Sequence, residues 1–260
     1  MVAPVNSLSN LSLRLVTAAV LIAAFLLALF VAPAWGWLAF VALFLTGGAW
    51  EWAGLFKQGP RVRGVYALAT LALAIALAQG PLAGQPLIYY PSLLVWFLLV
   101  PFWLWRGWGL PHPVVGLGLG WLLLMPTLLA LLHLRAESPW LVLATVAIAV
   151  VADSAAYFAG RRFGKHKLAP TISPGKTREG AYGGALAVAL YGLALGAPIL
   201  LFLVLFALSV LGDLFESWLK RRAGLKDSGH LLPGHGGVLD RIDSQLAVLP
   251  IAALSWILLK

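Results

Sequence analysis

The stretch PWLVLATVAIAVVADSAAYFAG, residues 139–160, decides the fold class. Its apolar side chains form a continuous run without the alternation of a membrane β-barrel strand, which predicts a helix. The run is long enough for the about 20 residues that a helix needs to cross the hydrocarbon core of a bilayer. Asp153 lies towards the end of this run. The segment is therefore predicted to be a membrane-spanning helix that carries an acid.

Similar apolar runs occupy most of the chain. The 260 residues are 62% hydrophobic and only 10% charged, whereas a soluble domain has roughly a quarter charged residues. The absence of cysteine excludes thiol chemistry and cysteine-bound metals. The sequence thus predicts an all-α polytopic transmembrane helix bundle of about nine spans. The windows are 14–33, 37–56, 64–79, 88–105, 116–134, 139–160, 181–196, 197–218 and 244–259.

Basic residues are concentrated in alternate loops. With nine spans, sixteen of the eighteen Lys and Arg residues fall on one side, and only Arg135 and Lys260 fall on the other. Short loops rich in Lys and Arg stay in the cytoplasm, so we expect the N-terminus inside and the C-terminus outside. This placement accounts for the net charge of +9 without a nucleic-acid partner. The first window also resembles a signal peptide, but its length favours an uncleaved anchor.

Acidic residues gather in the C-terminal half. Seven of the nine lie between Asp153 and Asp243, where the longest polar segments, 161–180 and 219–243, are both predicted to be cytoplasmic loops. A carboxylate inside an apolar helix is costly unless it is paired, hydrated or bound to metal, which favours a functional role for Asp153. A buried ion pair is the alternative. Glu51, in the second window, is expected to pair either with one of the loop cations or with Lys57.

The first loop contains the segment ISPGKT, residues 172–177. A Pro-Gly turn before a Lys and a hydroxyl group suits contact with phosphate oxygens, which makes Ser173, Lys176 and Thr177 candidates for substrate binding. The segment is not a P-loop, because no Gly lies five residues before Gly175.

The eighth window ends in a polar helix face. Asp213, Glu216 or Ser217, and Lys220 recur at three or four residues, so they lie on one side of a helix.

The loop that follows leads into the last window. Asp240 and Asp243 are three residues apart at the predicted start of a helix, where the positive end of the dipole stabilises carboxylates. The preceding glycines, Gly234, Gly236 and Gly237, flank His235. Such a flexible stretch costs conformational entropy, and close approach of the backbone to a ligand is a natural reason for it.

Together these segments provide hard oxygen ligands and many cations. This is the chemistry of Mg²⁺ and phosphates rather than of zinc. The sequence therefore predicts a phosphoryl- or nucleotidyl-transfer site at the cytoplasmic membrane surface.

The pattern SxxKRxxxxKDxxxxxPGHGGxxDRxD, residues 217–243, is similar at every fixed position to the phosphatidate cytidylyltransferase family, also called CDP-diacylglycerol synthases. The segments DSAAY (153–157), KxKLxPxISPxKTxEG (165–180) and GDxxES (212–217) also resemble this family. The resemblance divides the chain into variable N-terminal transmembrane helices (1–140) and a C-terminal catalytic transmembrane region (141–260).

The resemblance implies a multi-pass enzyme of the bacterial inner membrane with its active site on the cytoplasmic side. CTP and phosphatidic acid from the surrounding membrane lipids would give CDP-diacylglycerol and pyrophosphate in phospholipid biosynthesis, with Mg²⁺ as cofactor. A second cation such as K⁺ and a homodimer remain open. The lipid phosphate is already anionic near neutral pH, so in-line attack on the α-phosphorus of CTP requires no general base.

Residue roles carried over from the family fall into three groups. Mg²⁺ coordination is expected from Asp213 and Asp240, with Asp153 and Asp243 in supporting or second-metal roles. Phosphate contacts are expected from Ser173, Lys176, Thr177, Lys220, Arg221, Lys226, Arg241 and the amides of Gly236 and Gly237, with Ser217 and Asp227 also in the substrate site. His235 either donates to a phosphate or orients Asp240.

Three other functions stay open on the sequence. A CTP-dependent lipid-alcohol kinase would release CDP, and an archaeal-type relative would use ether-linked phosphatidate. A transporter requires polar residues through the full depth of several spans, whereas the outer halves of these spans are almost uniformly apolar.

Overall fold

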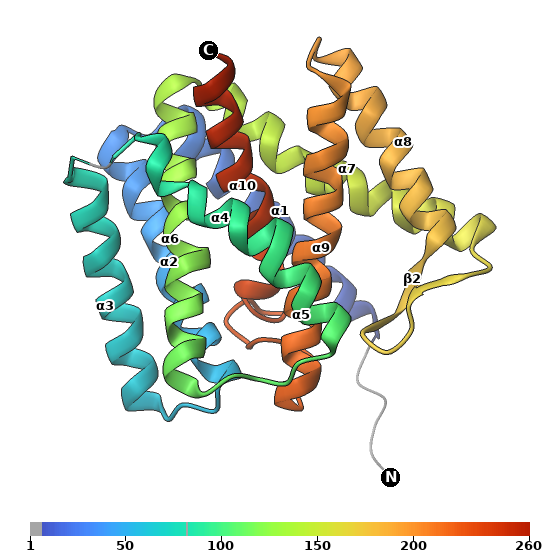
Figure 1. The fold of residues 1–260 in the computed structure, drawn as a ribbon, viewed down its shortest axis with the longest axis horizontal. Coiled ribbons are helices and arrows are strands. Elements are labelled where there is room, and N and C mark those ends of the chain that lie inside the picture. The colour runs from blue at the N-terminus through green and yellow to red at the C-terminus, as the bar shows by residue number, and fades with distance from the viewer. Residues whose placement is uncertain (1–6, 82) are drawn as a thin grey trace.

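The computed structural model of the protein describes residues 7–81 and 83–260. These residues are mostly helical, and Figure 1 shows the helices as one bundle with a small hairpin at its side. The elements are α1 (Ser7–Phe30), α2 (Ala34–Leu55), α3 (Pro60–Gln79), η1 (Pro86–Ile88), α4 (Tyr90–Leu94), η2 (Val95–Leu99), α5 (Val100–Arg106), α6 (Pro113–Glu137), α7 (Pro139–Phe163), β1 (Lys167–Ala169), β2 (Ser173–Thr177), α8 (Arg178–Ala194), α9 (Ile199–Ala223) and α10 (Leu239–Leu259).

The helical segments confirm the predicted transmembrane bundle. Within the described ranges, eight are long and apolar enough to cross a membrane, and η1, α4, η2 and α5 together make the fourth of them. The remaining predicted window, 181–196, forms α8, whose 17 residues are at the short limit for a span. Figure 1 shows α8 running from the hairpin back to the end of the bundle where α9 begins.

The first predicted loop is instead partly a β-hairpin. β1 and β2 pair antiparallel, with Lys167 opposite Thr177 and Ala169 opposite Ser173. The predicted Pro-Gly turn is wrong, because residues 174–175 lie within β2 and the chain reverses before Ser173. A two-stranded sheet consists only of edge strands, and an edge strand tolerates the missing N–H of a proline.

The second predicted loop is shorter than expected and covers residues 224–238. The helix α9 continues to Ala223 because Lys220, Arg221 and Arg222 lie in its last turn, where cations suit the dipole. Gly224, with φ of 79°, then ends the helix.

The last helix, α10, occupies the centre of the bundle and packs between α6 and α9 (Figure 1). Every residue from Ser244 to Leu254 is buried, as expected of a helix surrounded by others. The core is continuous from Ala28 in α1 to Leu254 in α10, so both predicted regions of the chain contribute to it. The first turns of α10 carry Asp240 and Asp243 into contact with neighbouring helices.

Candidate active site

Three aspartates from three helices approach one another at one end of α10. Asp153 of α7, Asp213 of α9 and Asp243 of α10 are close enough for their charges to interact. Gly212 permits this approach, because a Cβ at that position would lie 2.7 Å from the carbonyl oxygen of Asp243. The close crossing of α9 and α10 therefore places two of the acids side by side.

Lys176 reaches this cluster from the hairpin. Its Nζ forms an ion pair with Oδ2 of Asp213, and Oδ1 of the same carboxylate accepts a hydrogen bond from Ser217 Oγ at 3.2 Å. An ammonium group therefore contacts the carboxylate that the sequence predicts as a metal ligand. The hairpin thus supplies positive charge to the acid cluster.

Asp240 belongs to a neighbouring buried network. Its Oδ1 lies 2.6 Å from Nζ of Lys220, whose Nζ is also 2.6 Å from Oε2 of Glu216. Its Oδ2 accepts hydrogen bonds from the amides of Gly237 at 2.8 Å and Ser228 at 3.0 Å. Ser228 Oγ is also 3.0 Å away, and its one hydrogen is shared between Asp240 and a second carboxylate, that of Glu51. Lys220 is only 8% exposed, so it holds Asp240 in place rather than presenting its charge at an open surface.

Glu51 is a site residue whose role the sequence did not identify. It is fully buried on α2, and its Oε2 accepts hydrogen bonds from Ser228 Oγ at 3.0 Å and from the Leu239 amide at 2.8 Å. The expected pairing with Lys57 or a loop cation is therefore wrong. These bonds attach α2 to both ends of the glycine-rich segment, and the Leu239 amide at the start of α10 is one of the donors that a helix leaves unpaired. In the sequence, the only sign of a special role for Glu51 was its position as an acidic residue within an apolar window.

Two glycines of the 224–238 loop enclose the carboxylate of Glu51. A Cβ at Gly229 would lie 2.3 Å from Oε1, and one at Gly237 would lie 2.4 Å from Oε2. Gly236 has φ of 81°, a conformation that favours glycine. The glycines are thus explained by contacts within the protein, and the Gly237 amide, a predicted phosphate donor, is already bonded to Asp240.

Gly237→Ala is expected to destabilise the protein by about 1–3 kcal/mol, the usual effect of overpacking a well-packed interior. The added Cβ would also lie 2.1 Å from Ser228 Oγ, so the loop would have to move. Thermal unfolding in detergent measures the effect. Gly118→Ala is the control, because a Cβ there meets no atom within 4 Å in the described structure. Equal unfolding midpoints for the two variants would contradict the packing described here.

Thr177 has a structural role in this fold. Its Oγ1 accepts a hydrogen bond from the Gly180 amide at 3.1 Å and so caps the N-terminus of α8. Gly160 and Gly180 pack against it, since a Cβ on either would come within 3.0 Å of Oγ1. The hydroxyl is therefore packed between α7 and α8 rather than open to a substrate.

The hairpin is also attached to the start of α8 through Glu179. Oε1 of Glu179 lies 2.6 Å from Nδ1 of His166, and the amides of Lys165 and His166 donate to the carboxylate. These hydrogen bonds, that from His166 above all, lower the pKa of Glu179 to about 2. The carboxylate is thus ionised at physiological pH and holds β1 beside α8, which positions Lys176.

The other residues predicted for the site lie partly at the cavity and partly away from it. Arg241 and His235 line the same cavity as Asp153, Asp240 and Asp243. Arg221 is exposed and donates to the Leu225 carbonyl oxygen at 3.2 Å, which is a contact with its own helix end. Lys226 and Asp227 are exposed in the loop, and Ser173 is half-buried at the start of β2.

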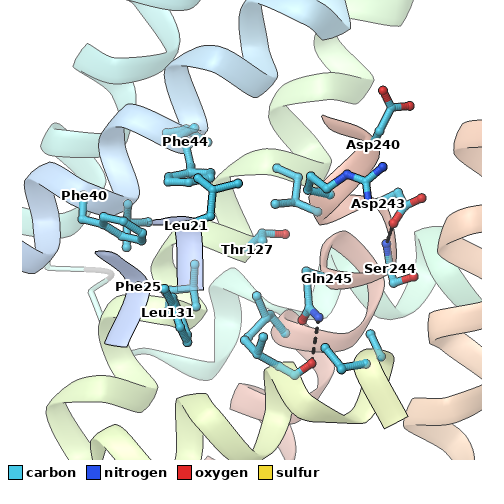
Figure 2. Close-up of a pocket in the computed structure, with 18 of the residues that line it drawn as sticks. Leu21, Phe25, Phe40, Phe44, Thr127, Leu131, Asp240, Asp243, Ser244 and Gln245 are labelled. Atoms are coloured by element: carbon cyan, nitrogen blue, oxygen red, sulfur yellow. Dashed lines mark hydrogen bonds between the residues drawn. The ribbon is translucent and has the colours of Figure 1, made fainter. Parts of the chain in front are cut away.

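The cavity has a volume of about 510 Å³ and two chemically different ends. One end is polar, with Asp153, Arg241 and Asp243. The other end is apolar and is lined by helices α1, α2 and α6. Figure 2 shows Asp240 and Asp243 on one side, Phe25, Phe40 and Phe44 on the other, and Thr127 and Gln245 between them. This arrangement suits a ligand with a charged head and an apolar body.

The sequence is similar to those of known cytidylyltransferases. The profile of the cytidylyltransferase family matches residues 12–259. A phosphatidate cytidylyltransferase of Pseudomonas aeruginosa is 40% identical over 265 residues, which cover 84% of this chain and 88% of its own. One of Haemophilus influenzae is 34% identical, with coverage of 91% and 95%. One of Staphylococcus epidermidis is 47% identical over 127 residues, 45% of this chain and 49% of its own.

Proposed function

Since the chain belongs to the cytidylyltransferase family and is a nucleotidyltransferase of the membrane, we propose that it converts CTP and phosphatidate into CDP-diacylglycerol and pyrophosphate. One observation supports the lipid substrate most strongly. The cavity joins a charged end, where Asp153, Arg241 and Asp243 lie, to an apolar end between α1, α2 and α6. A phosphate with acyl chains matches both ends, whereas a soluble acceptor matches only the first.

The reaction is an in-line displacement. An oxygen of the lipid phosphate forms a bond to the α-phosphorus of CTP, and the bond to the β-phosphate oxygen breaks, so pyrophosphate takes the electron pair. The attacking oxygen is already anionic, because the second phosphate pKa is about 6. Positioning and charge neutralisation then account for catalysis. Arg241 at the cavity and Lys176 on the hairpin are the cations placed for this, and Lys220 holds Asp240.

The acid cluster fits Mg²⁺ in its chemistry. Among the described residues no three His, Cys, Asp or Glu side chains already converge as a metal centre, but Mg²⁺ usually takes one or two carboxylates together with substrate phosphates and waters. Asp213, with Asp153 and Asp243 beside it, would hold the ion once Lys176 leaves its Oδ2. Asp240 would join only if Lys220 moved, since Lys220 contacts its Oδ1. When bound, the ion would neutralise charge on the phosphates.

The charged end of the cavity is proposed to face the cytoplasm of a bacterial inner membrane. Lys176, Lys220 and Arg241 lie near this end, and basic residues concentrate on the cytoplasmic side of membrane proteins. CTP would then enter from the cytoplasm and phosphatidate from the bilayer.

Purified protein with phosphatidate, Mg²⁺ and each of the four nucleoside triphosphates tests the proposal. Pyrophosphate is expected with CTP and phosphatidate together, and not when either is left out. Release of CDP from labelled CTP would instead indicate a kinase. Turnover that continues unchanged in excess EDTA would overturn the role of Mg²⁺.

A further inference from the structure

We infer that the apolar end of the cavity binds an acyl chain of the lipid substrate and that α1 determines which chain length fits. This inference rests on the proposed function, because it assigns the body of the lipid whose phosphate lies at the acid cluster. The binding site for the acyl chain is formed largely by the N-terminal helices and lies outside the motif-bearing residues 150–250.

The walls of this chamber are hydrocarbon. Leu21, Ile22 and Phe25 come from α1, Phe40 and Phe44 from α2, and Leu131 from α6. Phe25 packs against Phe40 with ring centroids 6.3 Å apart, and Phe40 against Phe44 at 4.9 Å. Figure 2 shows these rings grouped at the end of the cavity away from Asp240. No charged side chain lines this end in the described part of the chain.

Because the walls of the chamber are apolar, they favour a hydrocarbon chain over water as the ligand. A chamber lined by Leu and Phe does not hold water, because water there would lack polar partners. Left empty, its wall atoms would lose dispersion contacts. A membrane supplies hydrocarbon chains to fill it. Because the chamber is continuous with Asp153, Arg241 and Asp243, the chain that fits best belongs to a lipid with a phosphate at that end.

Gln245 lies where the polar end meets the chamber. Its side chain is 8% exposed, and Nε2 donates to the Val146 carbonyl oxygen at 3.2 Å. Oε1 has no hydrogen-bond partner among the described residues. A buried amide oxygen of this kind accepts a hydrogen bond from a ligand or a water. We therefore expect the glycerol part of the lipid and its bound water to lie beside Gln245, and the acyl chain to lie beyond it.

The helix α1 forms an outer wall of the chamber. Towards its C-terminus, Nε of Arg135 donates to the Leu29 carbonyl oxygen at 3.0 Å. Near its N-terminal end, Arg14 lies beside the 224–238 loop, since a Cβ at Gly234 would lie 3.1 Å from its Cγ. Val20 of α1 does not line the cavity and is 60% exposed, so we expect its side chain to face the bilayer. In the described structure α1 is therefore the outermost wall of the chamber.

Leu21→Trp tests the chamber by filling it. With dioleoyl phosphatidate, kcat/KM is expected to fall about tenfold, a typical discrimination for the size of an apolar pocket. With dioctanoyl phosphatidate it should stay close to the wild-type value, since a short chain leaves room for the indole. Val20→Trp is the matched control, because it adds the same ring on the outward side of α1 and should change neither value. An equal loss with both lipids, or no loss with either, would overturn the inference.

A binding measurement that needs no turnover separates this inference from the proposed function. Phosphatidate with a photoreactive diazirine at the end of one chain is expected to label peptides of α1, α2 or α6 in the wild type. Leu21→Trp should reduce that labelling, and Val20→Trp should not. Labelling elsewhere, with pyrophosphate still formed from CTP, would reject the chamber and keep the proposed function. Absence of pyrophosphate with every lipid would reject the proposed function itself.

Discussion

Asp240→Asn is expected to lower kcat/KM by about 10²–10³-fold, because Asp240 lines the cavity and fixes Lys220 there, and losses of this size follow the removal of one preorganised electrostatic contact in an active site. The carboxylate joins Lys220, Ser228 and Gly237, so the neutral amide loses the ion pair and one acceptor. Among the described residues, Lys220 would then keep only Glu216 as a carboxylate partner. Pyrophosphate release from CTP and phosphatidate measures the effect, and thermal unfolding in detergent shows whether the variant is folded.

Arg161→Ala is the control for this substitution. Arg161 is exposed at the end of α7, and its Nη1 donates only to Tyr157 Oη, at 3.3 Å, within the described structure. Its loss should change activity by no more than about twofold, as for most surface substitutions. A folded Asp240→Asn protein with near wild-type turnover would show that the Lys220–Asp240 pair is not needed for catalysis.

Glu51→Ala is expected to lower kcat by about tenfold to a hundredfold, because it leaves the Leu239 amide without its buried acceptor and leaves the Ser228 hydroxyl with Asp240 instead of two carboxylates. Glu51 does not line the cavity, so KM should change less than kcat. Glu51→Gln keeps an acceptor oxygen of similar reach and should restore most of the activity.

These two variants distinguish positioning from simple stability. If Glu51→Gln is as inactive as Glu51→Ala while both unfold at the wild-type temperature, then the negative charge matters and not the hydrogen bonds. If both are fully active, α2 does not position the loop. A rise in KM equal to the fall in kcat/KM would place Glu51 in substrate binding instead.

Much of the site could be predicted because its residues are close in sequence. The i, i+3 spacing of Asp240 and Asp243 placed both at the start of a helix, and the spacing of Asp213, Ser217 and Lys220 placed them on one helix face. The Ser217–Asp213 hydrogen bond follows directly from that periodicity. Helical repeats are local, so they require no knowledge of how the helices pack.

Contacts between distant segments could not be predicted in the same way. Glu51 and Ser228 are 177 positions apart, and no periodicity links them. The sequence likewise suggested that Thr177 and Gly237 face a substrate, whereas their hydroxyl and amide are used within the protein. A glycine or threonine in a polar loop serves either purpose, and only the neighbouring helices determine which.

From composition and local pattern alone, this protein had to be a bundle of membrane helices. Only helices and closed β-barrels satisfy their backbone groups in hydrocarbon, and the apolar runs lack the alternation of barrel strands. The motif residues, and the phosphate chemistry that their side chains suit, were also identified from the sequence. Packing alone decided that Lys220 is shared by Glu216 and Asp240, that α2 carries Glu51 to the loop, and that α1 lines an apolar chamber beside the acids. These features depend on which helix faces meet, and many apolar faces are equivalent until side-chain shapes fit together in three dimensions.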